Sequence, residues 1–534
     1  MTKTLLTGMF FFMISQCLSG QTDKVGDKWG YWQNWGDTGN GFYHNPLIPA
    51  DYSDIDCIRV GTVYYAISST FQYSPGLVIL VSKDLVNWRI LGHVVKDLRQ
   101  ISPEMNWDKM NRYGKGIWAG AIRYHAHKFW IYFGTPDEGY FMSTAKNAGG
   151  PWAPLHCVLP QKGWDDCCPF WDNDGQAYLI GTHFSENYKV HLFKMTTDGK
   201  QLIKGTDCVI HQSKGSEANK LYKINGTYYH LFSEVRNNGR ALMMERSKTL
   251  YGPYKAAKQL SYTQPDVNEP NQGGLVQTQN GDWFFLTHHG TGDWSGRVIS
   301  LLPVNWLNGW PMIGKVTPPE QMGKMAWSGK MPFVTADRAI YQTSDEFNLP
   351  ELQPQWEWNY QPRDDKWSLS NRKGWLRLKA FKTITAGGLL KAGNTLTQRS
   401  LRTKTNEVII RLDVSGMANG QKAGLAHFGA PDYAAFGISC KGAAKQLEFI
   451  KNGLVEEGEI FSGKEIWLKS RWGLDGKSRF YFSPDGSNYR PFGRVYQMAW
   501  ESYRGDRIAI YSYNELSDAG YIDVDFFHYN YTKN

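Results

Sequence analysis

Three acidic residues stand just before strand-like runs at separate places in the chain. Asp54 lies in "DYSDIDCIRVGTVYY", Asp166 in "GWDDCCPFWD" and Glu217 in "KGSEANKLYKING". Each stands among small or apolar residues, where an isolated carboxylate is costly to bury. The simple alternative is that each acid caps backbone N–H groups in a turn. If the fold brings the three together, they form an acid–base set suited to glycosidic bond hydrolysis.

Hydrolysis of a glycosidic bond gives each carboxyl group of such a set a distinct task. One must be protonated to donate to the leaving oxygen, and another must be ionised to activate water. An inverting enzyme keeps these two roughly 6.5–9.5 Å apart, which leaves space for the water. A third carboxylate nearby raises the pKa of the acid by like-charge repulsion and keeps it protonated near neutral pH.

A repeated pattern predicts a fold that would bring the three acids together. A turn, an aromatic pair or near-pair and further short strands recur at a spacing of roughly 50 to 65 residues. The opening segments of the five repeats lie at residues 61–71, 127–136, 175–184, 226–235 and 281–290. This spacing fits one four-stranded blade per repeat and predicts a five-bladed β-propeller, whose first strands meet near a central axis. Long helical periodicity is absent.

The pattern changes after residue 318. The stretch "TPPEQMGKMAWSGKMP" is rich in Pro, Gly and Met and predicts a linker, after which short alternating runs resume. About 190 residues of such strands fit one β-sandwich. We therefore predict an all-β protein with four parts: a signal peptide at 1–20, the propeller at 21–318, a linker at 319–343 and a β-sandwich at 344–534.

The N-terminus and the charge distribution bear on location and partners. Lys3 precedes an apolar stretch from Leu5 to Ile14, which is too short to span a bilayer and predicts an exported protein, periplasmic or secreted. Cys17 leaves lipoprotein anchoring as a minor alternative. The net charge of +9 is spread without a dense basic block, which argues against a nucleic-acid partner. The aromatic content of 15% suits a β-rich protein that stacks on sugar rings.

Cysteine and histidine spacing predicts no metal cluster. The seven cysteines include no CxxC pair, and free buried thiols are expected. His288 and His289 are adjacent, and because successive strand residues face opposite sides, at most one should face the axis. The segment "FSEVRNNGR" adds Glu234 and Arg236, for which we predict an ion pair near the rim.

Several segments together resemble glycoside hydrolase family 43, of the kind that joins a five-bladed propeller to a C-terminal β-sandwich of the jelly-roll, concanavalin-like type. They are "NPLIPADYSDIDCIRVG", "SKDLVNWRILGHVV", "GIWAGAIRYHAHKFWIYFGTPDEG", "GWDDCCPFWDNDGQAYL" and "SEANKLYKINGTYYH". The resemblance covers nearly the whole mature chain. It implies that Asp54 is the general base, Asp166 the residue that modulates the pKa of the acid, and Glu217 the general acid, with inversion at the anomeric centre.

The chain departs from the family pattern at several positions. Ser53 and Ile55 flank Asp54 where the family usually has proline, and Asp165 competes with Asp166 for the modulating role. Many relatives carry a histidine near the axis, sometimes beside a bound ion, where this chain has Gln272. We therefore expect no metal to be required for catalysis; structural calcium is left open but not predicted.

The same resemblance implies substrate contacts. Phe71, Trp118 and Arg297 match positions that line the terminal sugar pocket of the family, and Gln272 joins them as a candidate. An aromatic face stacks on the C–H face of a sugar, and Arg forks to two hydroxyls. The alternative is that Phe71 and Trp118 are blade core and that Arg297 forms a surface salt bridge.

We expect an exo-acting inverting glycosidase that releases terminal α-L-arabinofuranosyl residues from plant polysaccharides or oligosaccharides. A β-D-xylosidase or bifunctional enzyme is the first alternative, followed by a galactofuranosidase or exo-galactanase. A carbohydrate-binding propeller without turnover is the alternative outside the enzymes. The sandwich either buttresses the propeller, which the many buried-looking aromatics favour, or binds carbohydrate; the oligomeric state is not predicted.

Overall fold

The computed structural model describes most of the chain after the predicted signal peptide. The described residues are 30–237, 239–261, 271–290, 292–317, 322–333, 335, 338–339, 341–384, 388–429, 432–500 and 503–533. The predicted signal peptide at 1–20 lies outside them. The structure is nearly all-β, with 53% strand and 4% helix. The helices are short 3₁₀ turns: η1 (Gly30–Gln33), η2 (Leu98–Gln100), η3 (Pro103–Met105), η4 (Phe184–Glu186), η5 (Asp364–Lys366) and η6 (Gly388–Lys391).

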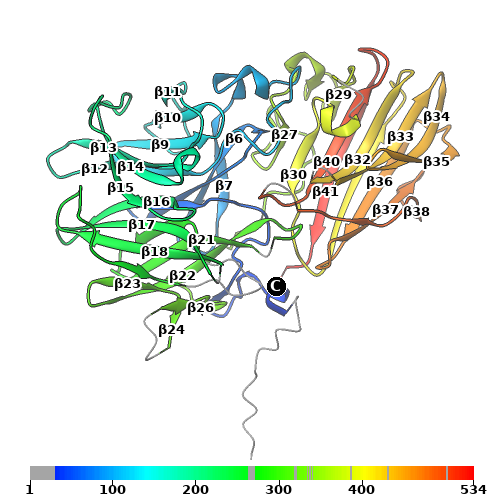
Figure 1. Ribbon diagram of the computed structural model, residues 1–534. Coiled ribbons are helices and arrows are strands. Elements are labelled where there is room, and N and C mark those ends of the chain that lie inside the picture. The colour runs from blue at the N-terminus through cyan, green and yellow to red at the C-terminus, as the bar shows by residue number, and fades with distance from the viewer. Residues whose placement is uncertain are drawn as a thin grey trace, which may run out of the picture.

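Five four-stranded antiparallel sheets follow one another along the first part of the chain (Figure 1). Blade I contains β3 (Asp56–Val60), β4 (Val63–Ser68), β6 (Gly76–Ser82) and β7 (Arg89–Val95). Blade II contains β8 (Gly120–His125), β9 (Lys128–Thr135), β10 (Gly139–Ala145) and β11 (His156–Leu159). Blade III contains β12 (Trp164–Trp171), β13 (Ala177–His183), β14 (Lys189–Met195) and β15 (Cys208–Gln212). Blade IV contains β16 (Glu217–Ile224), β17 (Thr227–Arg236), β18 (Gly239–Ser247) and β19 (Ala257–Gln259). Blade V contains β20 (Gly273–Gln277), β21 (Trp283–Gly290), β22 (Arg297–Leu307) and β23 (Trp310–Ile313).

The first strands of the blades gather at the centre of this ring. β3 contacts both β8 and β20, and β12 contacts both β8 and β16. Middle strands such as β9 and β13 are buried along almost their whole length, since a neighbouring blade covers each face. Their sequences are accordingly near-continuous apolar and aromatic runs instead of alternating ones. The predicted five-bladed propeller is confirmed. Its axis is the place where we predicted from the sequence that the three acids would meet.

Two large sheets form the second half of the molecule (Figure 1). One has the order β35-β34-β33-β32-β40-β30-β27-β5, and the other runs β28-β29-β41-β31-β36-β37-β38 with β39 beside β37. The strands of the first sheet are β27 (Glu357–Asn359), β30 (Leu396–Arg399), β32 (Gln421–Gly429), β33 (Asp432–Lys441), β34 (Ala444–Lys451), β35 (Leu454–Ile460) and β40 (Arg507–Asn514). Those of the second are β28 (Trp367–Ser368), β29 (Leu376–Lys379), β31 (Asn406–Asp413), β36 (Glu465–Trp472), β37 (Lys477–Ser483), β38 (Arg490–Pro491), β39 (Tyr496–Gln497) and β41 (Tyr521–Tyr531). Strands such as β31 alternate buried and partly exposed residues, as expected for sheets with one face in a core.

The segment predicted as a linker contains short strands that pair with the propeller side of the chain. β25 (Gly323–Lys324) pairs with β24 (Lys315–Val316), and β26 (Ser328–Lys330) pairs with β2 (Phe42–His44), which also pairs with β1 (Gly36–Asp37). The connection between the two halves is therefore held by hydrogen bonds along part of its length.

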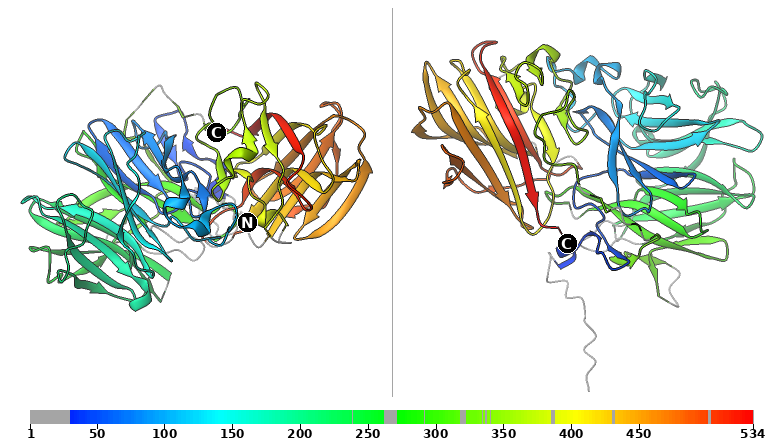
Figure 2. Two further views of the ribbon diagram at one scale, coloured as in Figure 1. Left: turned by 90° about the horizontal axis from the view of Figure 1, so that it is seen from above. Right: turned by 180° about the vertical axis from the view of Figure 1, so that it is seen from behind.

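The two domains lie side by side (Figure 2), and they share a sheet edge through strand pairing. β5 (Tyr73–Ser74) lies between β4 and β6 in sequence, yet it pairs with β27 of the sandwich. Next to this pairing, the buried Glu357 on β27 contacts Arg399 at 2.8 Å, Arg507 at 2.6 Å and His93 of blade I at 3.1 Å. The sandwich is thus fixed to blade I by backbone pairing and by a buried ionic cluster. In the part of the chain that the structure describes, no helix is long and apolar enough to cross a bilayer.

Candidate active site

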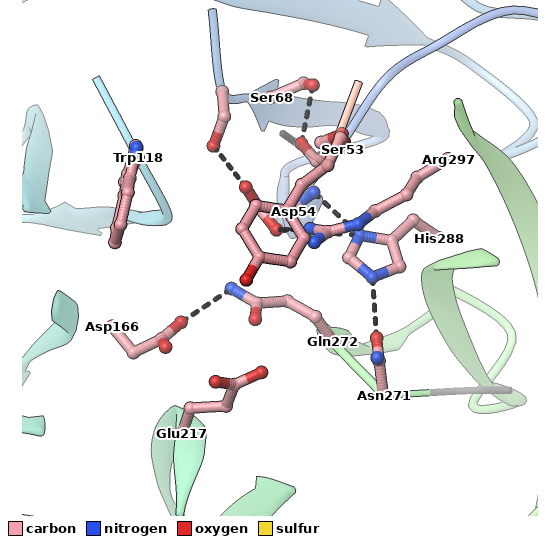
Figure 3. Close-up of polar contacts among 12 residues, drawn as sticks. Ser53, Asp54, Ser68, Trp118, Asp166, Glu217, Asn271, Gln272, His288 and Arg297 are labelled. Carbon is pink, nitrogen blue, oxygen red and sulfur yellow. Dashed lines mark hydrogen bonds and ion pairs between the residues drawn. The ribbon is translucent and has the colours of Figure 1, made fainter. Parts of the chain in front are cut away.

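The three predicted acids meet in one pocket at the propeller axis (Figure 3). Asp54 lies two residues before β3, Asp166 lies within β12, and Glu217 is the first residue of β16. All three line a pocket of about 410 Å³. The sequence prediction that the starts of the first strands would converge is therefore confirmed for these residues.

The backbone is unusual at each of the three acids. Asp54 and Asp166 have φ angles of 57° and 54°, and Ala218, directly after Glu217, has a φ of 64°. The register of β12 against β13 shifts between Asp165 and Cys168, and that of β16 shifts between Glu217 and Lys220. Bulges re-aim side chains, and left-handed backbone in ordinary residues costs about 1–3 kcal/mol, so both concentrate where function constrains the chain.

The three aspartates of "DYSDID" have three different environments. Asp51 accepts hydrogen bonds from Ser53 Oγ and from the backbone N–H of Arg297, and so fixes the entrance of β22. Asp56 points away from the pocket and bonds the backbone N–H of Ile122 and the guanidinium of Arg123. Of the three, only Asp54 faces the pocket. Regular strand alternation would place residues 54 and 56 on the same face, and the left-handed backbone at Asp54, with a φ of 57°, breaks that pattern.

Asp54 is held by groups from blades I and V. Its Oδ1 lies 2.6 Å from Arg297 Nη1, and its Oδ2 accepts a hydrogen bond of 2.7 Å from Ser69 Oγ. Its backbone N–H donates to His288 Nδ1 at 2.7 Å, so Nε2 of that ring carries the proton and donates to Asn271 Oδ1 at 2.6 Å. Burial raises the pKa of Asp54 above its ordinary value, and the charge of Arg297 acts in the opposite direction.

Glu217 lies on the opposite side of the pocket from Asp54 (Figure 3). Its Oε1 contacts Arg240 Nη1 at 3.0 Å, and its side chain is 33% exposed to the pocket. Burial beneath the pocket walls raises the pKa of Glu217 to about 7; the charge of Arg240 opposes this effect, and that of Asp166 adds to it. The group is therefore protonated in a large fraction of molecules near neutral pH, which a general acid requires.

The structure separates the two neighbouring aspartates of "GWDD". Asp166 Oδ1 accepts a hydrogen bond of 3.0 Å from Gln272 Nε2, which orients it over the pocket beside Glu217 (Figure 3). Asp165 also lines the pocket, but its Oδ1 is buried against the backbone of Gly134. Burial raises the pKa of Asp165 well above its ordinary value, and the charge of Asp166 raises it further. This arrangement favours Asp166 over Asp165 as the residue that acts on Glu217.

Aromatic and cationic side chains complete the walls. The predicted contacts Phe71, Trp118, Gln272 and Arg297 all line the pocket. Further lining residues, which sequence reasoning missed, are Phe184, Tyr188, Asn271, Arg240, Trp500 and Tyr503. Tyr503 belongs to the sandwich, and its ring lies 5.0 Å from the Arg297 guanidinium.

Two of the missed residues illustrate what the sequence did and did not signal. Arg240 follows the "NNG" turn, and its position opposite Val235 in the hairpin could have been counted from that turn. Tyr503 carried no signal, because its place depends on how the two domains dock.

The predicted ion pair between Glu234 and Arg236 is confirmed at 2.8 Å. His288 faces the pocket while His289 is buried against Ser300, in agreement with the prediction. The six cysteines of the described chain are free, as predicted.

A propeller whose axis opens into a pocket lined by carboxylates, two arginines and aromatic rings defines a glycoside hydrolase. Comparison with known proteins agrees. The family description "Glycosyl hydrolases family 43" matches residues 43–311, and "Beta xylosidase C-terminal Concanavalin A-like domain" matches residues 344–530. The chain belongs to glycoside hydrolase family 43.

The relatives indicate which activities occur nearby in the family. A "Beta-xylosidase" of Formosa agariphila is 32% identical over 93% of this chain and 92% of its own, and a "Putative beta-xylosidase" of Xylanibacter ruminicola is 35% identical over 89% and 87%. A "Non-reducing end alpha-L-arabinofuranosidase" of Bacteroides ovatus is 29% identical over 63% of this chain. Among solved structures, a "Bifunctional GH43-CE" protein of Bacteroides eggerthii superposes with a TM-score of 0.82 at 30% identity; the match covers 92% of this chain but only 64% of that longer one.

Proposed function

We propose that this glycosidase is an exo-acting, inverting β-D-xylosidase that removes terminal xylosyl residues from plant polysaccharide fragments. The observation that carries the proposal is the convergence of Asp54, Asp166 and Glu217 in one pocket. The two relatives that match most of this chain are named "Beta-xylosidase" and "Putative beta-xylosidase". From the sequence alone, α-L-arabinofuranosidase is the first expectation and β-D-xylosidase the second. The names of the relatives lead us to propose β-D-xylosidase first.

The proposed mechanism is a single displacement. Asp54 takes a proton from a water molecule as that water attacks the anomeric carbon, and Glu217 gives its proton to the departing oxygen. Asp166 keeps Glu217 protonated through its negative charge. Arg297, held against Asp54, and Gln272, held against Asp166, remain within reach of sugar hydroxyls while they fix the two carboxylates.

The walls of the pocket support attack at chain ends. Aromatic residues of blades I, II and III stand around the acids, and Tyr503 and Trp500 of the sandwich add a further side. A terminal ring enters between them, whereas an internal sugar would need an open groove that lets the chain continue in both directions. The sandwich therefore contributes directly to the proposed substrate site.

An α-L-arabinofuranosidase is the second candidate, because the Bacteroides ovatus relative carries that name and terminal arabinofuranose presents hydroxyls similar to those of xylose. A panel of nitrophenyl β-D-xyloside, α-L-arabinofuranoside and β-D-galactofuranoside, followed by xylo-oligosaccharides, separates these activities. The proposal requires the highest kcat/KM on xyloside and release of xylose from the non-reducing end. Proton NMR of the first product must show the inverted anomer; a retained anomer contradicts single displacement.

We also propose that turnover needs no metal ion. The support is that Gln272 occupies the axial position and binds Asp166 through its amide, while Arg297 and Arg240 supply positive charge to the other two acids. Prolonged dialysis against EDTA should leave kcat on nitrophenyl xyloside unchanged. Complete loss of turnover that calcium restores would contradict this part of the proposal.

A further inference from the structure

A second cluster of ionisable side chains lies on blade III, beside the pocket but outside the proposed acid–base set. His183 ends β13, Glu186 ends η4 and His191 lies on β14. His191 pairs with Gly181, two residues before His183, so the two imidazoles lie on the same face of the sheet. Each of the three residues offers one ligand atom, and these atoms all lie within 4.8 Å of one another.

Two imidazoles and a carboxylate are a donor set that Zn²⁺ and similar transition-metal ions prefer. His183 Nδ1 and Glu186 Oε1 are 3.4 Å apart. That separation matches the edge of a tetrahedron with bonds of about 2.0–2.1 Å, which is roughly 3.3 Å. Glu186 has an exposed side chain and can swing to close the remaining distance.

The environment of His191 supplies an independent indication. Its side chain is only 11% exposed, and among the described residues neither ring nitrogen has a hydrogen-bond partner. Buried polar groups without partners are rare and costly, and a bound ion is one way to satisfy them. Asp207 Oδ2 lies 3.7 Å from His191 Nδ1, placed to orient the ring as a carboxylate does behind a metal-bound histidine.

His183 is also held in place before any ligand binds. Its ring stacks on Trp164 with centroids 4.3 Å apart and planes within 5°. An imidazole fixed in this way loses little conformational entropy on binding an ion. The local charge is mixed, because Lys189 Nζ lies 3.3 Å from Glu186 Oε2 and competes for that carboxylate.

We propose that His183, Glu186 and His191 bind one Zn²⁺ ion, with water completing the coordination. The segment between the ligands contains Phe184 and Tyr188, which both line the pocket. A bound ion would fix this wall of the pocket from behind. The site is distinct from the acid–base set, and its existence does not depend on the proposed function because binding is measured directly.

The experiment is a titration of the untagged, EDTA-treated full chain with Zn²⁺ alone by isothermal calorimetry, followed by Co²⁺ titration with visible absorption as a geometric probe. We expect one equivalent of Zn²⁺ and a Co²⁺ spectrum typical of four-coordinate nitrogen and oxygen ligands, which Zn²⁺ abolishes. Glu186→Gln changes only an exposed side chain and should weaken binding at least about tenfold. Lys189→Gln removes the competing cation and should strengthen it by about threefold.

His156→Gln is the matched control, because this histidine lies on blade II outside the cluster and contacts the carbonyl oxygen of Lys200. It should bind Zn²⁺ like the unchanged protein. His191→Gln should abolish the Co²⁺ spectrum, with circular dichroism as the check on folding. The proposal is overturned if Zn²⁺ does not bind stoichiometrically, or if binding is the same in Glu186→Gln, Lys189→Gln and the control.

Discussion

Two glutamates of this molecule, the fully buried Glu357 and the half-buried Glu217, face opposite electrostatic conditions. Glu357, at the junction of the domains, is enclosed by two arginines and a histidine. Burial alone would raise its pKa, but the charges of Arg399 and Arg507 outweigh that effect and hold the pKa below its ordinary value. Glu217, in the pocket, contacts a single arginine, and burial together with Asp166 raises its pKa to about 7.

The difference shows what separates a structural carboxylate from a chemical one in the same fold. A carboxylate with its oxygens occupied by cations stays ionised and holds two domains together. A carboxylate with one cation, a neighbouring negative charge and an open side toward the pocket can gain and lose a proton near neutral pH. The number of partners at each site, more than burial, decides between the two behaviours.

The largest expected effect tests the chemical side of the comparison. Glu217→Gln keeps the shape of the side chain but removes the proton, so kcat/KM on xylobiose should fall by about 10²–10⁴-fold. Nitrophenyl xyloside, whose leaving group needs less protonation, should be affected less. Glu234→Gln on the same blade is the matched control and should retain nearly full activity. A variant at Glu217 with near-normal rates on xylobiose refutes its role as general acid.

The structural side is tested by Glu357→Gln. Removing one partner from a buried ionic cluster leaves the others uncompensated, and the free energy of unfolding should fall by about 3–5 kcal/mol. Because the folded pKa of Glu357 lies below the unfolded value, its contribution is present above about pH 4.3 and is lost as the pH falls toward the folded pKa. Calorimetric unfolding at pH 7 measures the loss of stability in the variant, and the same measurement at pH 3.5 tests whether that loss becomes smaller in acid.

Glu465→Gln serves as the comparison for that variant, since its pair with Arg411 is 30% exposed and should contribute less than about 1 kcal/mol. Folded Glu357→Gln protein should also hydrolyse nitrophenyl xyloside within about twofold of the unchanged enzyme. Equal stability of the two variants would mean that the junction cluster does not act as described.

A smaller effect is expected on the pH profile of Asp166→Asn. The substitution removes a negative charge beside Glu217, so the pKa of Glu217 falls and the alkaline limb of kcat/KM moves to lower pH, by about 0.5–1 unit. Asparagine can still accept the hydrogen bond from Gln272 and tolerates the left-handed backbone. Asp165→Asn should move the limb less, and the reverse order would exchange the roles of the two aspartates.

The smallest expected effect is a gain in stability at alkaline pH, opposite in sign to the loss expected for Glu357→Gln. The folded pKa of Glu217 lies above its unfolded value, so its ionisation destabilises the folded state as pH rises from about 4.5 through 7. Glu217→Gln should therefore unfold about 1–2 °C higher than the unchanged protein at pH 8, with no difference at pH 4.5. A lower melting temperature at pH 8 would show that the contact with Arg240 outweighs the cost of burial.

Much of this fold follows from local sequence patterns. Five repeats of turn and aromatic strand were enough to predict five blades, and the acids before the first strands were enough to predict where they meet. These features are set within one blade at a time, so single-sequence reasoning reaches them.

The remaining features depend on contacts between distant segments. Trp500 and Tyr503 line the pocket only because the sandwich docks against blade I, and no local pattern encodes that docking. The bulges at Asp165 and Glu217 shift the register after the acids, which periodicity alone does not reveal. The cluster of His183, Glu186 and His191 was missed because a sheet diagonal, and not a sequence spacing, brings its members together.

The strand β5 has a consequence for how the protein is made. Its neighbour Gln72 contacts Asn359 across 287 positions of the chain, so the first blade leaves the ribosome long before its partner strand exists. Contacts of such sequence separation form late and slow folding, and an unpaired strand edge invites wrong partners in the meantime. β5 can pair with β27 only after the last third of the chain has begun to be synthesised. In a chain truncated before residue 357, β5 would remain unpaired.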